Sequence, residues 1–164
     1  MKTKYPNPQV PDHPKKSPFL DFEQADSTKG EAEFWVNGDD SEPAALHADF
    51  NNGKPYDLEE RTARFGEAII RFAKKIPRGP GNNRLIDQLV GAATSVGANY
   101  CEADEGVSRK DFKKSIGTCK KEARETKFFL RMVATAEVGL KPEARKLWRE
   151  AKELHLIFCS LYRK

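Results

Sequence analysis

The sequence predicts an all-α fold, an antiparallel up-down bundle of four helices preceded by a disordered N-terminal tail. Three observations support this prediction. Four successive segments of residues 55–164 carry apolar residues at three- and four-residue steps, the period of a helix with one buried face. Short stretches with proline or glycine separate these segments, so neighbouring helices should run in opposite directions. Residues 1–54 show no sustained periodicity of helix or strand.

The composition of the first 54 residues favours disorder. Residues 1–20 contain five prolines, four lysines and one aspartate, for a net charge of +3. Residues 21–54 contain nine acidic residues and two lysines, for a net charge of −7. Such segments bury too little apolar surface to offset the entropy lost on ordering. The apolar cluster "AEFWV" at residues 32–36 is an exception that could form a short docking strand or an adhesive apolar motif.

Start signals place the four helices in the rest of the chain. Asp57 opens the first helix, with an acidic residue three positions later as in a capping box. Residues 77–83 are rich in proline and glycine, which predicts a loop before a second helix from about Arg84 to Asp104. Ser108 begins the third helix as Asp57 begins the first, and Pro142 suits the first turn of the fourth. The residues expected on the buried faces are Leu58, Phe65, Ile69, Phe72, Ile76, Ile86, Leu89, Ala93, Val96, Tyr100, Ala103, Phe112, Ile116, Cys119, Ala123, Thr126, Leu130, Val133, Leu147, Ala151, Leu154, Phe158 and Leu161.

The sequence lacks the residue spacings that are typical of catalytic and metal-binding sites. Di-iron bundles need Glu-x-x-His pairs, and the sequence has none. His155 and Cys159 have a spacing that metals can use, but a site would need a third ligand from Cys101 or Cys119. The glycines fit neither a P-loop nor a dinucleotide-binding loop. We therefore expect a protein that is not an enzyme, with no catalytic, cofactor-binding or metal-binding residues and no cofactor.

The expected setting is cytoplasmic. Three cysteines without a Cys-x-x-Cys pair argue against a disulfide framework. The basic N-terminus is not followed by the apolar segment of a secretory signal. No apolar run approaches the length of a membrane span.

Charge on the third helix is segregated into two stripes. At about 100° per residue, one group of cations falls within about a quadrant beside the apolar face. We call this group the basic stripe: Lys110, Lys113, Lys120, Arg124, Lys127 and Arg131. The fourth helix adds Arg145, Arg149, Lys152 and Arg163 along one side of its own apolar face. The opposite side of the third helix carries an acidic flank of Asp111, Glu122 and Glu125.

Three interpretations of this charge pattern remain open. Residues 55–164 carry 23 basic and 15 acidic residues, a net charge of +8, and the basic stripe could contact phosphates without reading sequence. Alternatively, the basic stripe of one subunit could meet the acidic flank of the next and close a ring. The third interpretation is a solvated helix face with local pairs such as Glu125 with Lys121.

The second half of the second helix has a mixed character. Residues 94–106 read "TSVGANYCEADEG", and the carboxylates around Glu102 could serve acid–base chemistry or a solvated helix end. Glycine inside a helix costs about 1 kcal/mol relative to alanine, which predicts a packing role for Gly97. We expect Asn99 to need a buried hydrogen-bond partner and Glu102 to pair with a cation of another helix or subunit. The residues predicted to serve packing or assembly are Ser95, Gly97, Asn99, Tyr100, Glu102, Glu122 and Glu125.

The central part of the sequence also resembles a known family. Residues 88–133 read "QLVGAATSVGANYCEADEGVSRKDFKKSIGTCKKEARETKFFLRMV". The segments "SVGANY", "SRKDF" and "KEARET" occur in the order found in the four-helix bundle proteins first noted as products of intervening sequences in bacterial 23S rRNA genes. That family also includes the accessory variability determinant proteins of diversity-generating retroelements. The resemblance extends over residues 56–164, and Phe129 stands where a tryptophan is expected.

The resemblance implies a left-handed up-down bundle that assembles into a ring-shaped homo-oligomer, for which a pentamer is expected. It also implies a basic surface that binds nucleic acid, with structured RNA as the expected partner, and, in retroelements, a reverse transcriptase as a protein partner. It implies no catalysis. The residues expected to contact nucleic acid are the basic stripe together with Arg145, Arg149 and Lys152.

Overall fold

The computed structural model describes residues 33–35 and 57–164. The rest of the predicted disordered tail, residues 1–54, lies outside the described residues. Residues 33–35 are helical, so the strand considered for this cluster is not formed at these three residues. The rings of Phe34 and Trp35 meet edge to face, with their centroids 5.4 Å apart.

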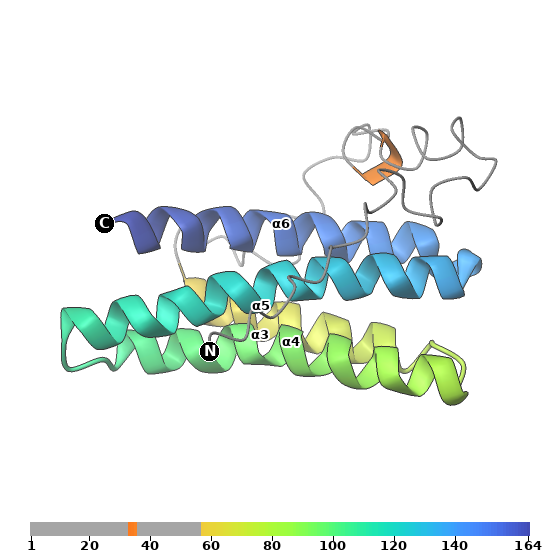
Figure 1. Cartoon of the computed structure of the whole chain (residues 1–164), viewed down its shortest axis with the longest axis horizontal. Coiled ribbons are helices and arrows are strands. Elements are labelled where there is room, and N and C mark those ends of the chain that lie inside the picture. The colour runs from red at the N-terminus through yellow and green to blue at the C-terminus, as the bar shows by residue number, and fades with distance from the viewer. Residues whose placement is uncertain (1–32, 36–56) are drawn as a thin grey trace, which may run out of the picture. The chain divides into compact units, whose positions relative to one another are not determined.

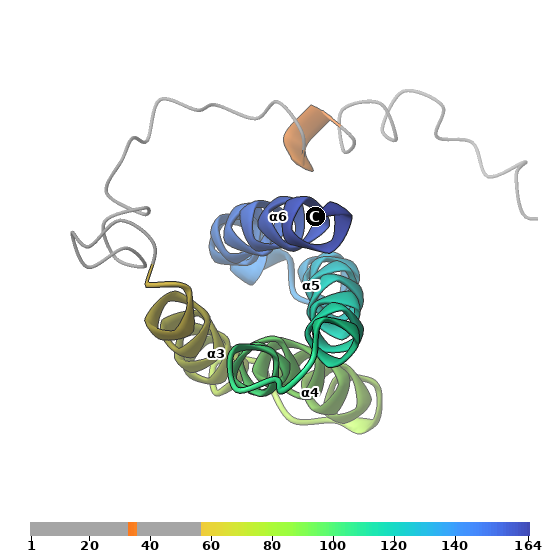
Figure 2. The same ribbon diagram turned by 90° about the vertical axis from the view of Figure 1, so that its left-hand side faces the viewer.

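Four long helices dominate the remaining described residues, and none of these residues is in a strand (Figure 1). The elements are α3 (Leu58–Ala73), α4 (Pro80–Asp104), α5 (Arg109–Ala136), the 3₁₀ turn η1 (Val138–Leu140) and α6 (Lys141–Arg163). Figure 2 looks along the helices and shows them in chain order around a common centre. Each helix packs against the next, and α6 also contacts α3. The all-helical prediction with four long helices is thus confirmed.

Two predicted helix starts are confirmed by their capping hydrogen bonds. The backbone N–H of Glu60 donates to Asp57 Oδ1 over 3.0 Å at the start of α3. The N–H of Asp111 donates to Ser108 Oγ over 3.1 Å at the start of α5. Each side chain satisfies one of the amides that the first helical turn leaves without an intrahelical acceptor.

The predicted loop at residues 77–83 is too long, because α4 begins at Pro80 rather than near Arg84. Proline is accommodated in the first turn, where its missing N–H would have no intrahelical acceptor. The neighbouring polar groups are also satisfied: Asn83 Oδ1 accepts from Gly79 N over 3.3 Å, and Asn82 Nδ2 donates to Pro77 O over 3.0 Å. Loop-forming residue types therefore form the first turn of a helix here.

The apolar faces predicted from periodicity form the core. All but four of the predicted core residues are buried, and the exceptions are half-buried. Three of these four, Leu58, Phe112 and Leu161, lie in a first or last helical turn, where fewer neighbours cover a side chain. None of the helices in the described ranges is both long enough and apolar enough to cross a membrane.

A buried ion pair that the periodicity did not predict connects α3 to α6. Arg61 Nε and Nη2 donate to the two carboxylate oxygens of Glu150 over 2.6 and 3.0 Å. The Glu150 side chain is 2% exposed and that of Arg61 16%. A second, exposed pair joins Lys75 Nζ to Glu143 over 2.7 Å, near the start of α6.

Candidate nucleic-acid interface

Two aromatic rings of α6 hold the ammonium groups of four lysines. Lys113 and Lys120 of α5 place Nζ 5.3 and 4.4 Å from the ring centroid of Tyr162. Lys127 of α5 and Lys152 of α6 place Nζ 5.0 and 5.9 Å from a ring of Trp148. We call Lys113, Lys120, Lys127 and Lys152 the lysine row. Because a cation is attracted to the face of an aromatic ring, these contacts restrict otherwise flexible side chains.

The helix spacing explains how the rings and lysines meet. Lys113, Lys120 and Lys127 are seven residues apart, so they recur on one side of α5. Gly117 lies between the first two, and a Cβ added there would be 3.2 Å from Cε2 of Tyr162. The absence of a side chain at Gly117 therefore lets the Tyr162 ring lie close to the α5 backbone between two lysines.

The lysine row carries positive charge that no carboxylate neutralises. Across the part of the chain that the structure describes, none of its four members forms an ion pair. Burial lowers the pKa of Lys127, and the nearby charges of Lys152 and Arg124 lower it further. An anion placed among these cations would relieve their mutual repulsion.

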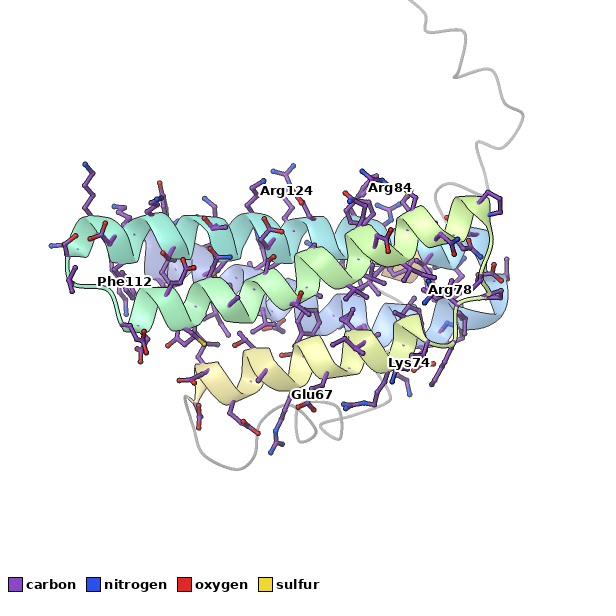
Figure 3. The ribbon with its side chains drawn as sticks, turned by 90° about the horizontal axis from the view of Figure 1, so that it is seen from below. Glu67, Lys74, Arg78, Arg84, Phe112 and Arg124 are labelled. Carbon is purple, nitrogen blue, oxygen red and sulfur yellow. The ribbon has the colours of Figure 1, made fainter. Side chains whose placement is uncertain are left out.

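The other residues predicted to contact nucleic acid differ in how exposed they are and in whether they already contact other residues of the chain. Lys110, Arg124 and Arg131 are exposed on α5, and Arg145 and Arg149 are half-buried on α6. Figure 3 shows Arg124 extending outward from α5, on the side opposite to that from which Glu67 extends from α3. Arg131, Arg145 and Arg149 already take part in contacts within the chain. The lysine row, Lys110 and Arg124 are therefore the cations best placed to meet a ligand.

The three residues of the acidic flank all interact with neighbouring groups of α5 or its cap, so less of their negative charge is available to another molecule. Asp111 serves the helix cap, where Ser108 Oγ donates to its Oδ2 over 2.6 Å. Lys121 Nζ lies 3.5 Å from Glu125, which confirms the predicted local pair, and 3.8 Å from Glu122. Burial raises the pKa of Glu122, and the charge of Glu125 raises it further, whereas Lys121 lowers it.

The predicted assembly residues of α4 find partners mostly within this chain. Asn99 Nδ2 donates to Ser95 O over 2.8 Å, so this side chain has a part-buried hydrogen-bond partner, and that partner lies in its own helix. The Tyr100 ring lies 6.0 Å from that of Phe158 in α6, and burial and the charge of Asp104 raise the pKa of its hydroxyl. Glu102 is exposed and, among the described residues, forms no ion pair. The ion pair expected between Glu102 and another helix of this chain is therefore not formed.

Two substitutions of Gly97 should separate the effect of helix propensity from that of packing between α3 and α4. A Cβ at this position would contact Thr62 of α3 at 3.5–3.7 Å, which is ordinary van der Waals distance. Gly97→Ala should therefore raise the free energy of unfolding by up to about 1 kcal/mol through helix propensity. Gly97→Leu should lower it by about 1–3 kcal/mol by forcing α3 away from α4. Urea unfolding of both variants tests this, and a destabilised alanine variant would contradict it.

A sequence profile described as 23S rRNA-intervening sequence protein matches residues 56–159. The chain belongs to this family. The crystal structure of a protein with unknown function from the S23 ribosomal protein family of Bacteroides thetaiotaomicron VPI-5482 is also similar, with a TM-score of 0.59 and 22% sequence identity. That match covers 65% of this chain and 99% of the other, and at this identity it shows the fold alone. Comparison with curated proteins found no match.

Two of the cysteine thiols make contacts with nearby groups of the same chain. His155 Nδ1 lies 2.9 Å from the carbonyl oxygen of Lys120, so Nδ1 must donate, and Nε2 lies 3.5 Å from Cys159 Sγ. Cys119 Sγ lies 3.5 Å from Val96 O, and burial raises the pKa of this thiol to about 12. Within residues 33–35 and 57–164, no three His, Cys, Asp or Glu side chains gather as a metal ion would need.

Sequence reasoning missed Trp148 and Tyr162 as parts of the candidate interface. They are fourteen residues apart on α6, twice the seven-residue spacing of the lysines on α5. Matching periods on consecutive helices were therefore a usable signal. Arg84 was also missed, and it extends from α4 on the same side as Arg124 (Figure 3).

Proposed function

We propose that this member of the 23S rRNA-intervening sequence protein family is a non-catalytic nucleic-acid-binding protein whose partner is structured RNA. The observation that carries the proposal is the lysine row, held on two α6 rings with no carboxylate partner in the described chain. Fixed cations lose less conformational entropy when they bind phosphate.

The dimensions of the lysine row fit a nucleic-acid backbone. Lys113 and Lys127 are fourteen residues apart, which at about 1.5 Å per residue is about 21 Å along α5. A nucleic-acid strand places several phosphates within that length. Contacts of this kind fix the position of the backbone without reading its sequence.

A salt series on the full chain tests the proposal. Anisotropy with a labelled RNA hairpin should show an affinity that falls linearly with salt on logarithmic axes, with a slope steeper than about −2. A DNA duplex of equal length shows whether RNA is preferred. Undetectable binding of both at low salt would refute the proposed function.

We further infer that the four helices form an antiparallel up-down bundle with a left-handed twist. Lys113, near the start of α5, contacts Tyr162, near the end of α6, whereas Lys127 contacts Trp148, near the start of α6. This pairing supports opposite directions for α5 and α6. The left-handed twist rests on the resemblance of residues 88–133 to the family.

A second candidate function is a structural homo-oligomer or protein scaffold, expected as a pentameric ring. It is favoured by the placement of Glu122 and Glu125 on one side of α5 and the basic stripe on another, because one copy could pair with the next. Light scattering should then show an oligomer whose mass decreases as salt is raised. A monomer at every salt concentration would contradict the ring.

The resemblance also extends the proposal to a cytoplasmic accessory factor of a reverse transcriptase. Such a protein would present RNA to the enzyme without itself catalysing a reaction. Co-purification of a reverse transcriptase with the tagged chain from its own cells supports this role, and recovery of RNA without that enzyme would contradict it.

A further inference from the structure

An aromatic side chain lies exposed beside the basic stripe of α5. Phe128 is 55% exposed. It follows Arg124 by four residues, and at about 100° per residue the two side chains are about 40° apart around the helix. Its angular position is that of Lys110, a member of the basic stripe. A single exposed apolar side chain is common on protein surfaces, but one beside a cation such as Arg124 combines the two groups that single-stranded nucleic acids contact.

The ring of Phe129 packs against that of Phe128. Phe129 is half-buried, and the two ring centroids are 5.3 Å apart with an interplanar angle of 78°. In this edge-to-face arrangement the more buried ring limits how the exposed one can turn. Lys127, the residue before Phe128, lies on the side of α5 that faces Trp148 of α6, with its Nζ 5.0 Å from a ring of that residue. A base on Phe128 would therefore place its own phosphates near Lys127 and Arg124.

We propose that Phe128 is a stacking site for an unpaired RNA base, whose flanking phosphates contact Arg124 and the lysine row. This inference rests on the proposed RNA binding and names the part of the RNA that is recognised. A base within a duplex is already stacked on both faces and cannot cover the ring. An unpaired base in a loop, bulge or single strand can, whatever its identity, because every base has a π face.

The test compares RNAs that differ only in their bases. Three labelled ligands are used with the full chain: a single strand of about ten nucleotides, a duplex of the same length, and the strand with abasic residues that retain every phosphate. Phe128→Ala should weaken binding of the single strand by about 5- to 100-fold and leave the duplex affinity unchanged. The abasic strand should bind the wild type and the Phe128→Ala variant equally.

Two further variants separate stacking from apolar contact. Phe128→Trp keeps a π face and should retain the single-strand affinity, whereas Phe128→Leu should behave as the alanine variant does. Leu156 is the matched control, because it is 52% exposed and follows Lys152 of the lysine row by four residues. Leu156→Ala should not change the affinity for any of the three ligands.

Three outcomes would overturn the inference. Equal single-strand affinity of the wild type and Phe128→Ala removes the stacking site while the proposed RNA binding stands. Equal losses on strand and duplex, with a changed mass in light scattering, assign Phe128 to a contact between copies. Equal losses from Phe128→Ala and Leu156→Ala indicate a general apolar surface. Failure of the wild type to bind any ligand refutes the proposed function itself.

Discussion

Replacement of Arg61 by methionine is expected to lower the free energy of unfolding by about 3 kcal/mol or more. Methionine keeps most of the apolar stem but removes both hydrogen bonds to Glu150. The Glu150 carboxylate is 2% exposed and would be left in the core without a cation. The loss reflects the cost of an unpaired buried charge, which exceeds the net contribution of the pair itself.

Two further variants serve as controls: one removes both members of the buried ion pair, and the other removes an exposed ion pair. Arg61→Met combined with Glu150→Leu should recover most of the stability, because apolar residues can replace a buried ion pair with little net cost. Lys75→Met removes the exposed pair with Glu143 and should cost less than about 1 kcal/mol. Denaturant unfolding of all three variants supplies the comparison. Equal losses for Arg61→Met and Lys75→Met would show that burial does not decide the effect.

Neutralising three cations of the basic stripe is expected to weaken RNA binding by about 100-fold at about 0.1 M salt. The variant is Lys120→Gln, Arg124→Gln and Lys127→Gln together. Each lost phosphate contact should reduce the steepness of the salt dependence by about 0.7 for single-stranded RNA, or about 2 in total. Glutamine keeps the length of the side chains, and removal of the charge on Lys127 also relieves its repulsion by Lys152.

The matched control changes the net charge equally at a distant site. Lys74, Lys75 and Arg78 are exposed at the end of α3 and in the following loop, and all three become glutamine. Figure 3 shows Lys74 and Arg124 at opposite edges of the helices. The control should lose less than about 10-fold, because only screened, long-range attraction changes. Equal losses in both variants would show that net charge alone accounts for binding.

Features that depend on a few consecutive residues were predictable from the sequence. Asp57 and Ser108 cap their helices as the three-residue spacing indicated. The seven-residue pattern of α5, from Ile116 to Val133, is buried as predicted. Prediction was wrong where the same residue types are common both in loops and in the first turn of a helix. Pro80 begins α4 inside a predicted loop, because its fixed φ suits the first turn of a helix as well as a turn.

The sequence by itself determined that α5 carries its cations on one side, because a helix repeats its faces every 3.6 residues whatever surrounds it. Only the tertiary structure decided which of those cations are held in place. Lys113 and Lys120 share the Tyr162 ring, and Lys127 shares Trp148 with a lysine of α6. That pairing depends on the axial position of α6 relative to α5, which packing between the helices sets. Periodicity along one helix contains no information about that position, so the pairing became visible only once both helices were in place.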